Sequence, residues 1–450
     1  MHVNLTDQFV DDIFNICEAG FPNTVVHQAK RCLLDYLGST LAGAQLMKDK
    51  GEKLLEHLGS SYGDAAVIGF DRKIGVENAA FINGLSSHIA ELDDGVISGI
   101  VHPGSPVLSA LLPVAEKENV NGNDLVKGII VGYEVATRIA DAIQPSHKKR
   151  GYHATGTCGS IGAALGIATM LNFSKTQMKD VLSAVAVSAH GTLKVLEDDS
   201  ELKPYNVAQA AICAVLAASM GRAGFKGPND VLSGKTGFFS IMADELDEDQ
   251  LKPKEGDTFA VERVYVKPYA ACRYCHPAID AALKIRTEQS LRPEMVEFVK
   301  VATYELAVSK HDHSVVNNIS SAKMSIPYST AVALVVGKAG IGEYSDECIA
   351  NPETAALAQK VAVRADEDLT ALFPKCSAAK VEIITVDGKR FAERIDSPKG
   401  EAEFPLSDLE MEEKCVSLAM YAGKSEGESQ KIIKTVWNLE NELPNLFELL

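Results

Sequence analysis

The sequence predicts a mainly α-helical fold with a smaller α+β domain, on three observations. Apolar residues recur at helical spacing through the first two-thirds of the chain. Near Phe259 the pattern changes to short runs rich in β-branched and aromatic residues, which are typical of strands. After residue 400 the helical pattern returns and continues to Leu450. We therefore expect three segments: helical residues 1–266, α+β residues 267–399 and helical residues 400–450.

The helical elements are recognised by caps and apolar stripes. Ser174 and Gln177 form a capping box, in which each side chain binds a backbone amide at the start of a helix. Asn123 is expected to cap a helix that carries Leu125 and Ile129 on one face. Residues 207–220 are almost all small and apolar, which predicts a helix buried on every side.

The predicted strands share an enrichment in Val, Ile, Thr, Phe and Tyr; they are residues 259–266, 295–306, 381–385 and 390–395. The last two flank Asp387-Gly388, which is a strong signal for a β-hairpin. Helices are expected at residues 330–337 and 354–363.

The composition argues against several classes of protein. The 450 residues are 46% hydrophobic and 23% charged, as in ordinary globular chains. The formal charge of −17 argues against non-specific binding to nucleic acid. Nine widely spread cysteines, an odd number, do not form a disulfide framework. No secretory signal and no apolar stretch of about 18 residues is apparent, so we expect a cytoplasmic protein with no membrane partner.

The first polar segment places three carboxylates and a histidine within twelve residues. It contains Glu91, Asp93, Asp94 and His102. Pro103 suits the first turn of a helix, so His102 would lie at a helix N-terminus, where backbone amides attract anions. A carboxylate nearby can fix the tautomer of the imidazole. The alternative is an ordinary acidic loop between two helices.

The second segment, GYHATGTCGSIG, contains His153 and three glycines at the expected start of a helix. Small residues there would let a ligand carboxylate approach free amides near Gly156. The spacing of Gly156, Gly159 and Gly162 is not that of a dinucleotide-binding fingerprint. Close helix packing through small residues remains an equal alternative.

Two further segments carry cations. Lys203 precedes the buried Ala-rich helix, and it is either directed into a site or solvated at the surface. Lys267 and Arg273 lie where helical character gives way to α+β, a common place for ligand sites. They could bind carboxylates, or belong to a surface loop. Cys272 and Cys275 begin a C-x-x-C-H pattern, but no second pair exists to complete a zinc site and we expect neither haem nor metal.

Taken together in this order, these segments resemble the MmgE/PrpD family, which includes 2-methylcitrate dehydratases, cis-aconitate decarboxylases and iminodisuccinate epimerases. The resemblance covers essentially the whole chain. It is carried by the stretches HIAELDDGVISGIVHPGSPV, GYHATGTCGSIGAALGIA, HGTLKVLEDDSELKPYNVAQAA, GRAGFKGPNDVLSGKTGFF, KPYAACRYCHPAID and SIPYSTAVAL.

The resemblance implies a large all-helical domain made from both chain ends, an inserted α+β lid domain and a homodimer. It implies an active site between the domains that uses no metal and no organic cofactor. The implied catalytic residues are Asp93, His102, His153 and Lys203. The implied substrate-binding residues are Glu91, Asp94, Gly156, Lys267, Cys272, Arg273 and Tyr328.

The resemblance also implies an activity, the removal of a proton next to a carboxylate of a small di- or tricarboxylate. A dehydratase of the 2-methylcitrate type is the first expectation, and an epimerase of the iminodisuccinate type or a cis-aconitate-type decarboxylase is the alternative. Decarboxylase-type members carry Thr where this chain has Gly95, and a lid His where it has Cys272. A carboxylate-binding protein without turnover is the expectation from another class.

Overall fold

The computed structural model describes residues 4–58, 63–197, 200–253, 256 and 258–450. The chain forms two compact units. The first, here called the helical unit, comprises Met1–Leu196, Leu202–Val264 and Ser407–Leu450. The second, here called the sheet unit, comprises Glu197–Glu201 and Tyr265–Leu406. The prediction of a mainly helical protein with a smaller α+β part is confirmed.

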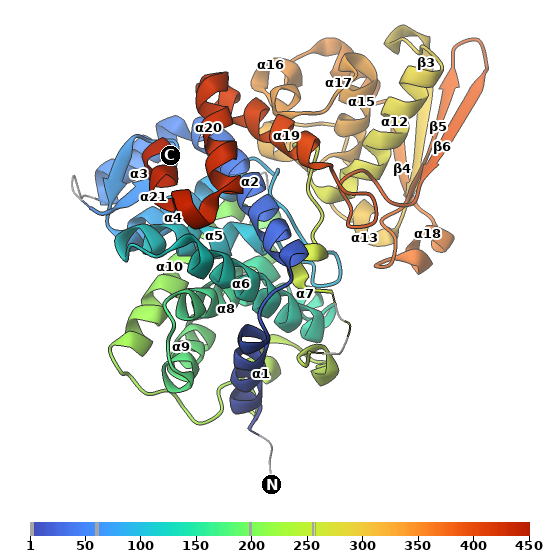
Figure 1. Cartoon of the computed structure of the whole chain (residues 1–450). Coiled ribbons are helices and arrows are strands. Elements are labelled where there is room, and N and C mark those ends of the chain that lie inside the picture. The colour runs from blue at the N-terminus through green and yellow to red at the C-terminus, as the bar shows by residue number, and fades with distance from the viewer. Residues whose placement is uncertain (1–3, 59–62, 198–199, 254–255, 257) are drawn as a thin grey trace. The chain divides into compact units, whose positions relative to one another are not determined.

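Helices make up most of the helical unit (Figure 1). Its helices are α1 (Leu5–Ala19), α2 (Asn23–Leu46), α3 (Lys48–Leu58), α4 (Val76–Ile89), α5 (Gly104–Lys117), α6 (Gly122–Ile143), α7 (Ser146–Lys149), α8 (Ala154–Met170), α9 (Lys175–Ser188), α10 (Lys203–Arg222), α11 (Phe238–Met242), α19 (Asp408–Tyr421), α20 (Glu426–Trp437) and α21 (Leu439–Leu449). The unit is not wholly helical, because β1 (Ala65–Val67) and β2 (Arg72–Ile74) form an antiparallel pair.

Helix α8 lies at the centre of the helical unit, and each of its residues is buried. It packs against α6, α5 and α10. The approach of α8 to α6 requires small residues, since a Cβ added at Gly162 would lie 2.4 Å from the carbonyl oxygen of Gly132. Residues 207–220 are helical within α10, but the prediction that this helix is buried on every side is wrong, because Leu216 and Met220 are exposed.

Side-chain caps set where several helices begin. The capping box of Ser174 and Gln177 is confirmed at the start of α9. Asn121, and not Asn123, caps α6, because its side chain accepts a hydrogen bond from the amide of Asp124. Pro103 is the N-cap residue of α5, so His102 lies immediately before a helix N-terminus, as predicted.

The C-terminal helices complete the helical unit, as Figure 1 shows for α19 and α21 beside helices from the N-terminal half. Helix α19 packs on α2, and Lys414 of α19 forms a buried ion pair with Asp35 of α2. The same ammonium group donates to the carbonyl oxygen of Leu92, at 2.9 Å. The last helices of the chain thus hold a loop that lies more than 300 residues earlier.

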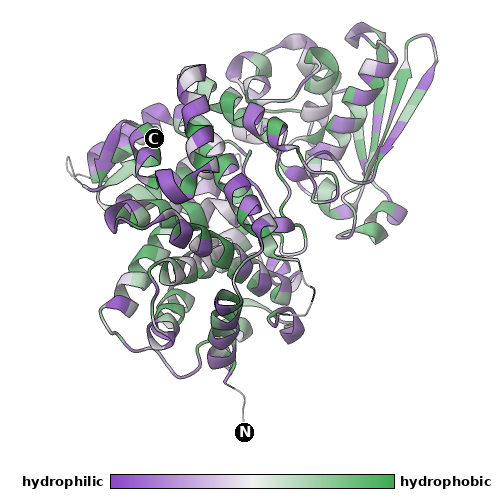
Figure 2. Ribbon diagram, viewed as in Figure 1, coloured by the Kyte–Doolittle hydropathy of each residue, from purple (hydrophilic) through white to green (hydrophobic). Residues whose placement is uncertain are grey.

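The sheet unit contains a four-stranded sheet in the order β4-β3-β5-β6, with strands β3 (Val296–Thr303), β4 (Val361–Ala365), β5 (Ala379–Thr385) and β6 (Arg390–Ile395). Strands β3 and β4 are parallel, whereas β3 with β5 and β5 with β6 are antiparallel. Buried residues alternate with less buried ones along β5, consistent with one covered face. Figure 2 shows both hydrophobic and hydrophilic residues in the strands of this sheet.

Helices accompany this sheet. They are α12 (His276–Glu288), α13 (Glu305–Val308), α14 (Ile319–Lys323), α15 (Ile326–Val336), α16 (Asp346–Ile349), α17 (Pro352–Ala358) and α18 (Glu367–Leu372). Helix α12 packs on β5 and β6, and α15 packs on β4. The predicted strands at 381–385 and 390–395 are confirmed, as is the hairpin at Asp387-Gly388. The strand predicted at 295–306 is confirmed over Val296–Thr303, and helix α13 begins at Glu305.

Two predicted elements are wrong. Residues 259–266 do not form a strand; they contain a 3₁₀ turn, Ala260–Glu262. The amide of Ala260 donates to the carboxylate of Glu134, so side chains take the place of a neighbouring strand. The helix predicted at 354–363 ends at Ala358, because the following residues join β3 as the parallel strand β4.

The crossing of α6 and α8 can be tested by adding one methyl group. We expect Gly162→Ala to lower the free energy of unfolding by about 1 to 3 kcal/mol, because the added Cβ overlaps the backbone of Gly132. Gly427→Ala in α20 is the control, since nothing lies within 4 Å of its added Cβ, and there the change should be neutral or stabilising by up to about 1 kcal/mol. Urea unfolding measures both, and equal effects would contradict the close packing.

Candidate active site

The acidic segment follows directly on α4 and is folded inward. Helix α4 ends at Ile89, and Glu91 adopts a positive φ of 55°, a conformation that residues with a side chain rarely take. This turn reverses the chain, and Glu91, Asp93 and Asp94 are all buried. Burial of three carboxylates requires cations and hydrogen-bond donors close by.

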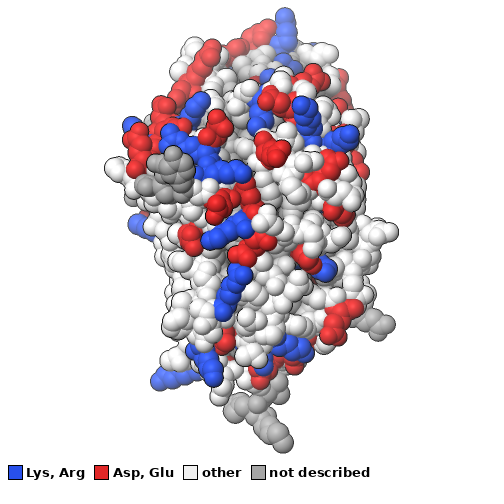
Figure 3. Space-filling view, turned by 60° about the vertical axis from the view of Figure 1, so that its left-hand side comes forward, with Lys and Arg blue, Asp and Glu red and all other residues white. Residues whose placement is uncertain are grey.

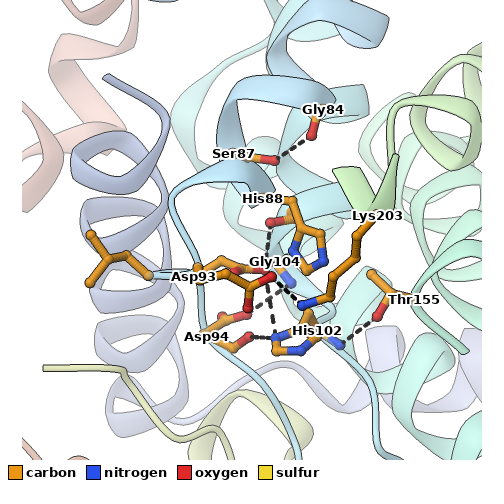
Figure 4. A network of polar contacts seen from close by, with 12 residues as sticks. Gly84, Ser87, His88, Asp93, Asp94, His102, Gly104, Thr155 and Lys203 are labelled. Atoms are coloured by element: carbon orange, nitrogen blue, oxygen red, sulfur yellow. Dashed lines mark hydrogen bonds and ion pairs between the residues drawn. The ribbon is translucent and has the colours of Figure 1, made fainter. Parts of the chain in front are cut away.

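Asp93 is the centre of the network in Figure 4. Its Oδ2 lies 2.7 Å from Nδ1 of His88, and it accepts a hydrogen bond of 2.9 Å from the hydroxyl of Ser105. Nδ1 of His102 lies farther away, 3.6 Å from the same oxygen. The main imidazole partner of Asp93 is therefore His88, in the last turn of α4, and not His102.

The surroundings of His102 fix its neutral tautomer. Its Nδ1 lies 2.6 Å from the backbone carbonyl oxygen of Asp94. A carbonyl oxygen only accepts hydrogen bonds, so Nδ1 carries the proton and Nε2 carries the lone pair. The amide of His102 donates to the hydroxyl of Thr155, which holds the backbone in place. His102 is thus arranged to take up a proton at Nε2.

The carboxyl group of Asp94, unlike its backbone carbonyl group, has partners other than His102. The hydroxyl of Tyr133 donates to one oxygen of its carboxyl group, at 2.6 Å, and the amide of Gly104 donates to the other, at 3.1 Å. Burial, above all, raises the pKa of Asp94 to about 7, and the nearby charges of Asp35 and Asp93 add to the effect. The carboxyl group of Asp94 therefore anchors the start of α5.

His153 has the opposite tautomer. It is the N-cap residue of α8, and its Nδ1 lies 3.2 Å from the side-chain nitrogen of Asn206 on α10. The same nitrogen donates to the carbonyl oxygen of Thr192, which fixes the orientation of the amide group. Asn206 therefore donates to Nδ1 of His153, and the proton of the neutral imidazole is on Nε2.

His153 is uncharged around neutral pH. Burial lowers its pKa well below 6.5, and positive charge on His88, Lys203 and His102 would lower it further. A neutral imidazole with its proton on Nε2 is a hydrogen-bond donor toward the site.

Lys203 lies at the first position of α10, and it is directed into the site and not solvated. Its ammonium group forms an ion pair with the buried carboxylate of Glu91. Helix α10 packs on both α4 and α8, so it brings Lys203 and Asn206 to the residues of the acidic segment and to His153. Figure 4 shows Lys203, His88 and His102 pointing toward one another.

Sequence comparison supports a relationship over nearly the whole chain. The N-terminal domain of the MmgE/PrpD family matches residues 8–250, and the C-terminal domain of the same family matches residues 269–439. The chain belongs to the MmgE/PrpD family.

Relatives of this MmgE/PrpD protein are similar along most of their length. A cis-aconitate decarboxylase-like protein of Aspergillus oryzae is 24% identical, over 97% of this chain and 95% of its own. The cis-aconitate decarboxylase of Homo sapiens is 25% identical, over 97% of this chain and 92% of its own. A cis-aconitate decarboxylase of Aspergillus terreus is 25% identical, over 86% and 84%.

Six of the residues predicted for the site lie together in the helical unit of this MmgE/PrpD protein: Glu91, Asp93, Asp94, His102, His153 and Lys203. Gly156 is near them, but its own amide is not free. Its amide donates to the carbonyl oxygen of His153, at 2.9 Å. Glycine is required at this position because a Cβ would lie 2.6 Å from the carbonyl oxygen of His190.

The other predicted residues belong to the sheet unit. Arg273 is buried, and its guanidinium group binds the carboxylate of Glu401, Nδ1 of His276 and the carbonyl oxygens of Pro398 and Lys399. This set engages each nitrogen of the group, so Arg273 joins neighbouring segments of its own unit.

Lys267, Cys272 and Tyr328, also in the sheet unit, differ in burial and in hydrogen bonding. Lys267 is fully buried, whereas Cys272 is half-buried. The hydroxyl of Tyr328 donates to the carbonyl oxygen of Glu343, at 2.9 Å. Among the described residues, no group of His, Cys, Asp or Glu side chains could hold a metal ion, and no helix is long and apolar enough to cross a membrane.

Two residues of the network, His88 and Asn206, are not predicted from the sequence. His88 stands five residues before Asp93 in HIAELDDG, and a histidine in a helix of small and apolar residues was the available signal. Asn206 follows Lys203 by three residues, but an asparagine near a helix start is more often a cap. Its role depends on His153 and Thr192, which the sequence does not place.

The raised pKa of Asp94 predicts a pH-dependent stability. The folded chain holds this proton up to about pH 7, whereas the unfolded chain releases it near pH 3.8, so the free energy of unfolding falls as the pH rises between these values. Asp94→Asn removes that dependence. The free energy of unfolding of the variant minus that of the unchanged protein should therefore increase by about 2 to 3 kcal/mol between pH 5 and pH 8. Urea unfolding at both pH values measures the difference, and a constant difference would contradict the assignment.

Proposed function

We propose that this protein is a cofactor-independent, cytoplasmic enzyme that removes a proton α to a carboxylate of a small di- or tricarboxylate, and that it dehydrates a substrate of the 2-methylcitrate type. The observation that carries the proposal is the pair of imidazoles with complementary tautomers. His102 offers a lone pair at Nε2, and His153 offers a proton at Nε2. A reaction that takes a proton from one atom and gives a proton to another needs such a pair.

His102 is proposed as the general base. Its Nδ1 proton is held by the carbonyl oxygen of Asp94, and the carboxylate of Asp93 lies 3.6 Å from Nδ1. When Nε2 takes up a proton, this carboxylate stabilises the imidazolium ion that forms. His102 is also the more exposed of the two histidines, with 16% of its side chain accessible.

His153 is proposed as the proton donor to the leaving hydroxyl group. A base at this position would need a lone pair at Nε2, and the hydrogen bond from Asn206 to Nδ1 excludes that tautomer of the neutral ring. The low pKa of His153 keeps it neutral, so it donates from an uncharged imidazole.

Lys203 is proposed to stabilise the negative charge that develops on the substrate. Loss of an α-proton places charge on the carboxylate oxygens, and a preorganised cation in a dry site stabilises that charge strongly. An ammonium group has three donors, so Lys203 can bind Glu91 and still reach a substrate oxygen. Glu91 is proposed to hold this cation in position.

The substrate-binding roles of Lys267, Cys272 and Tyr328 remain predictions that rest on the family resemblance. We leave Arg273 out of the proposed substrate contacts because Glu401 already binds its guanidinium group. We also leave out the amide of Gly156 and the carboxyl group of Asp94, which are both occupied.

Decarboxylation of cis-aconitate is the second candidate, and the names of the relatives favour it. Gly95 and Cys272 argue against it, since decarboxylase-type members carry Thr and His at these positions. Epimerisation would use the same base and donor, with the proton returned to the opposite face. Binding without turnover is the alternative from another class.

We also propose a homodimer, formed by the outer face of α10. Tyr205, Leu216 and Met220 form an exposed apolar stripe on this helix, and Leu202 and Phe225 extend it at the two ends. Contiguous exposed apolar side chains mark interaction surfaces. A two-fold axis beside α10 would bury the stripe of each protomer against that of its partner.

Substitution of Lys203 tests the chemistry. We expect Lys203→Ala to reduce turnover about 10²-fold or more, because the developing charge loses its cation. Proton NMR in D₂O with 2-methylcitrate, citrate, cis-aconitate and iminodisuccinate reports both loss of an α-proton and the product formed. Loss of hydroxyl, loss of CO₂ and racemised substrate separate the three reactions.

Two controls accompany this experiment. Lys127→Ala removes a cation from an exposed ion pair with Asp124 and should leave turnover unchanged. Because Lys203→Ala leaves Glu91 buried without its cation, the double variant Glu91→Gln/Lys203→Met is measured beside it. Normal turnover in a folded Lys203 variant would remove this residue from the mechanism.

The dimer is tested by Leu216→Glu, at a position with 49% of the residue exposed. We expect the unchanged protein to have the mass of a dimer and the variant that of a monomer, because two like charges would face each other across the axis. Leu409→Glu on α19 is the control, since Leu409 is equally apolar, is exposed and lies outside the stripe. Light scattering after size-exclusion chromatography measures the mass, and a monomeric unchanged protein would refute the proposal.

A further inference from the structure

His88 is a third imidazole in the site. The side chain is fully buried at the end of α4. Its ring centroid lies 5.1 Å from that of His102 and 5.9 Å from that of His153. The ring of His88 therefore packs against both of the proposed acid–base residues.

The two nitrogens of His88 have unlike surroundings. Nδ1 lies 2.7 Å from the carboxylate of Asp93 and carries a proton, because an ionised carboxylate only accepts. Nε2 is buried, and it has no hydrogen-bond partner among the residues that the structure describes. A buried acceptor that is left unpaired is costly, and native proteins pair such atoms with protein, water or ligand.

The surroundings of the ring indicate what kind of partner Nε2 takes. Asp93, His102 and His153 lie next to the ring, and Figure 4 shows Lys203 nearby. In Figure 4 the ring points from α4 toward Lys203 and His102. A lone pair in this position would repel a carboxylate and would accept a hydrogen bond from a hydroxyl group.

We propose that Nε2 of His88 accepts a hydrogen bond from the hydroxyl group of a hydroxy-substituted di- or tricarboxylate. This inference rests on the proposed function, and it narrows the substrate class to acids that carry a hydroxyl group next to the reacting carbon. Asp93 acts through His88, because in the neutral ring its carboxylate holds the proton on Nδ1, which leaves the lone pair on Nε2. Asp93 is thus a positioning residue for the hydroxyl acceptor.

A matched pair of ligands isolates this one hydrogen bond. Citrate and propane-1,2,3-tricarboxylate carry the same three carboxylates, and only citrate has the hydroxyl group. We expect the unchanged protein to bind citrate at least about tenfold more tightly, since the deoxy compound leaves Nε2 unpaired. Isothermal titration calorimetry gives both dissociation constants. A ratio near one in the unchanged protein would overturn the proposal, as would the absence of binding by either compound.

A matched pair of variants separates the acceptor from a purely structural role. His88→Asn keeps a donor for Asp93 but removes the acceptor at Nε2, so the citrate preference should fall to about one. His88→Gln keeps an acceptor near the position of Nε2, so part of the preference should remain. A residue that only supports Asp93 would give the reverse order, with His88→Asn behaving like the unchanged protein. His57→Asn, on the exposed side of α3, should change neither constant.

The unchanged protein provides a measurement that does not depend on a variant that folds. With ¹⁵N-labelled histidine, Nε2 of His88 should resonate as an unprotonated nitrogen, and citrate should shift it while the deoxy compound leaves it in place. A preference for citrate without any turnover in D₂O would contradict the proposed function but support the role of His88 as the hydroxyl acceptor. If His88→Asn turns over hydroxy acids at the unchanged rate, the role of His88 as the hydroxyl acceptor is contradicted and the proposed function is retained.

Discussion

The buried carboxylate of Asp93 is the constraint on which the site depends. An ionised carboxylate inside a protein is stable only when donors surround it, and here His88 and Ser105 provide them from α4 and α5. The turn at Glu91 brings the carboxylate to these donors, and Glu91 itself needs Lys203 of α10. Three helices are therefore tied together by charges that none of them could bury alone. Their alignment also sets the distances between the imidazoles.

Two histidines of the site carry the imidazole proton on different nitrogens. His102 and His153 are the same residue type in one cluster, yet a carbonyl oxygen faces Nδ1 of the first and an amide nitrogen faces Nδ1 of the second. In the proposed mechanism, these hydrogen bonds to Nδ1 would decide which ring acts as the base and which as the proton donor. The protein as a whole is acidic, and acidic and basic side chains are interspersed on the face shown in Figure 3. Under the proposed function, Lys203 would supply the positive charge for an anionic ligand.

Local signals in the sequence predict those parts of the fold that depend on local contacts. The capping box at Ser174 and the Asp387-Gly388 hairpin are formed by residues a few positions apart, and both are confirmed. The strand predicted at 259–266 fails because Glu134, far away in the sequence, binds the amide of Ala260. For Gly156, the nearby carbonyl oxygen of His190 supports the interpretation of close packing. His88 and Asn206 could not be identified because their roles exist only once α4, α8 and α10 are assembled.

The hydrogen bond from Lys414 to the carbonyl oxygen of Leu92 has a consequence for folding during synthesis. Leu92 is the residue directly before Asp93. Lys414, whose ammonium group binds Leu92, is synthesised more than 300 residues later. A nascent chain that has emerged only as far as α10 already contains each of the three histidines and Lys203. It still lacks Lys414, so we expect the turn that carries Glu91 and Asp93 to become fixed only after α19 has been synthesised.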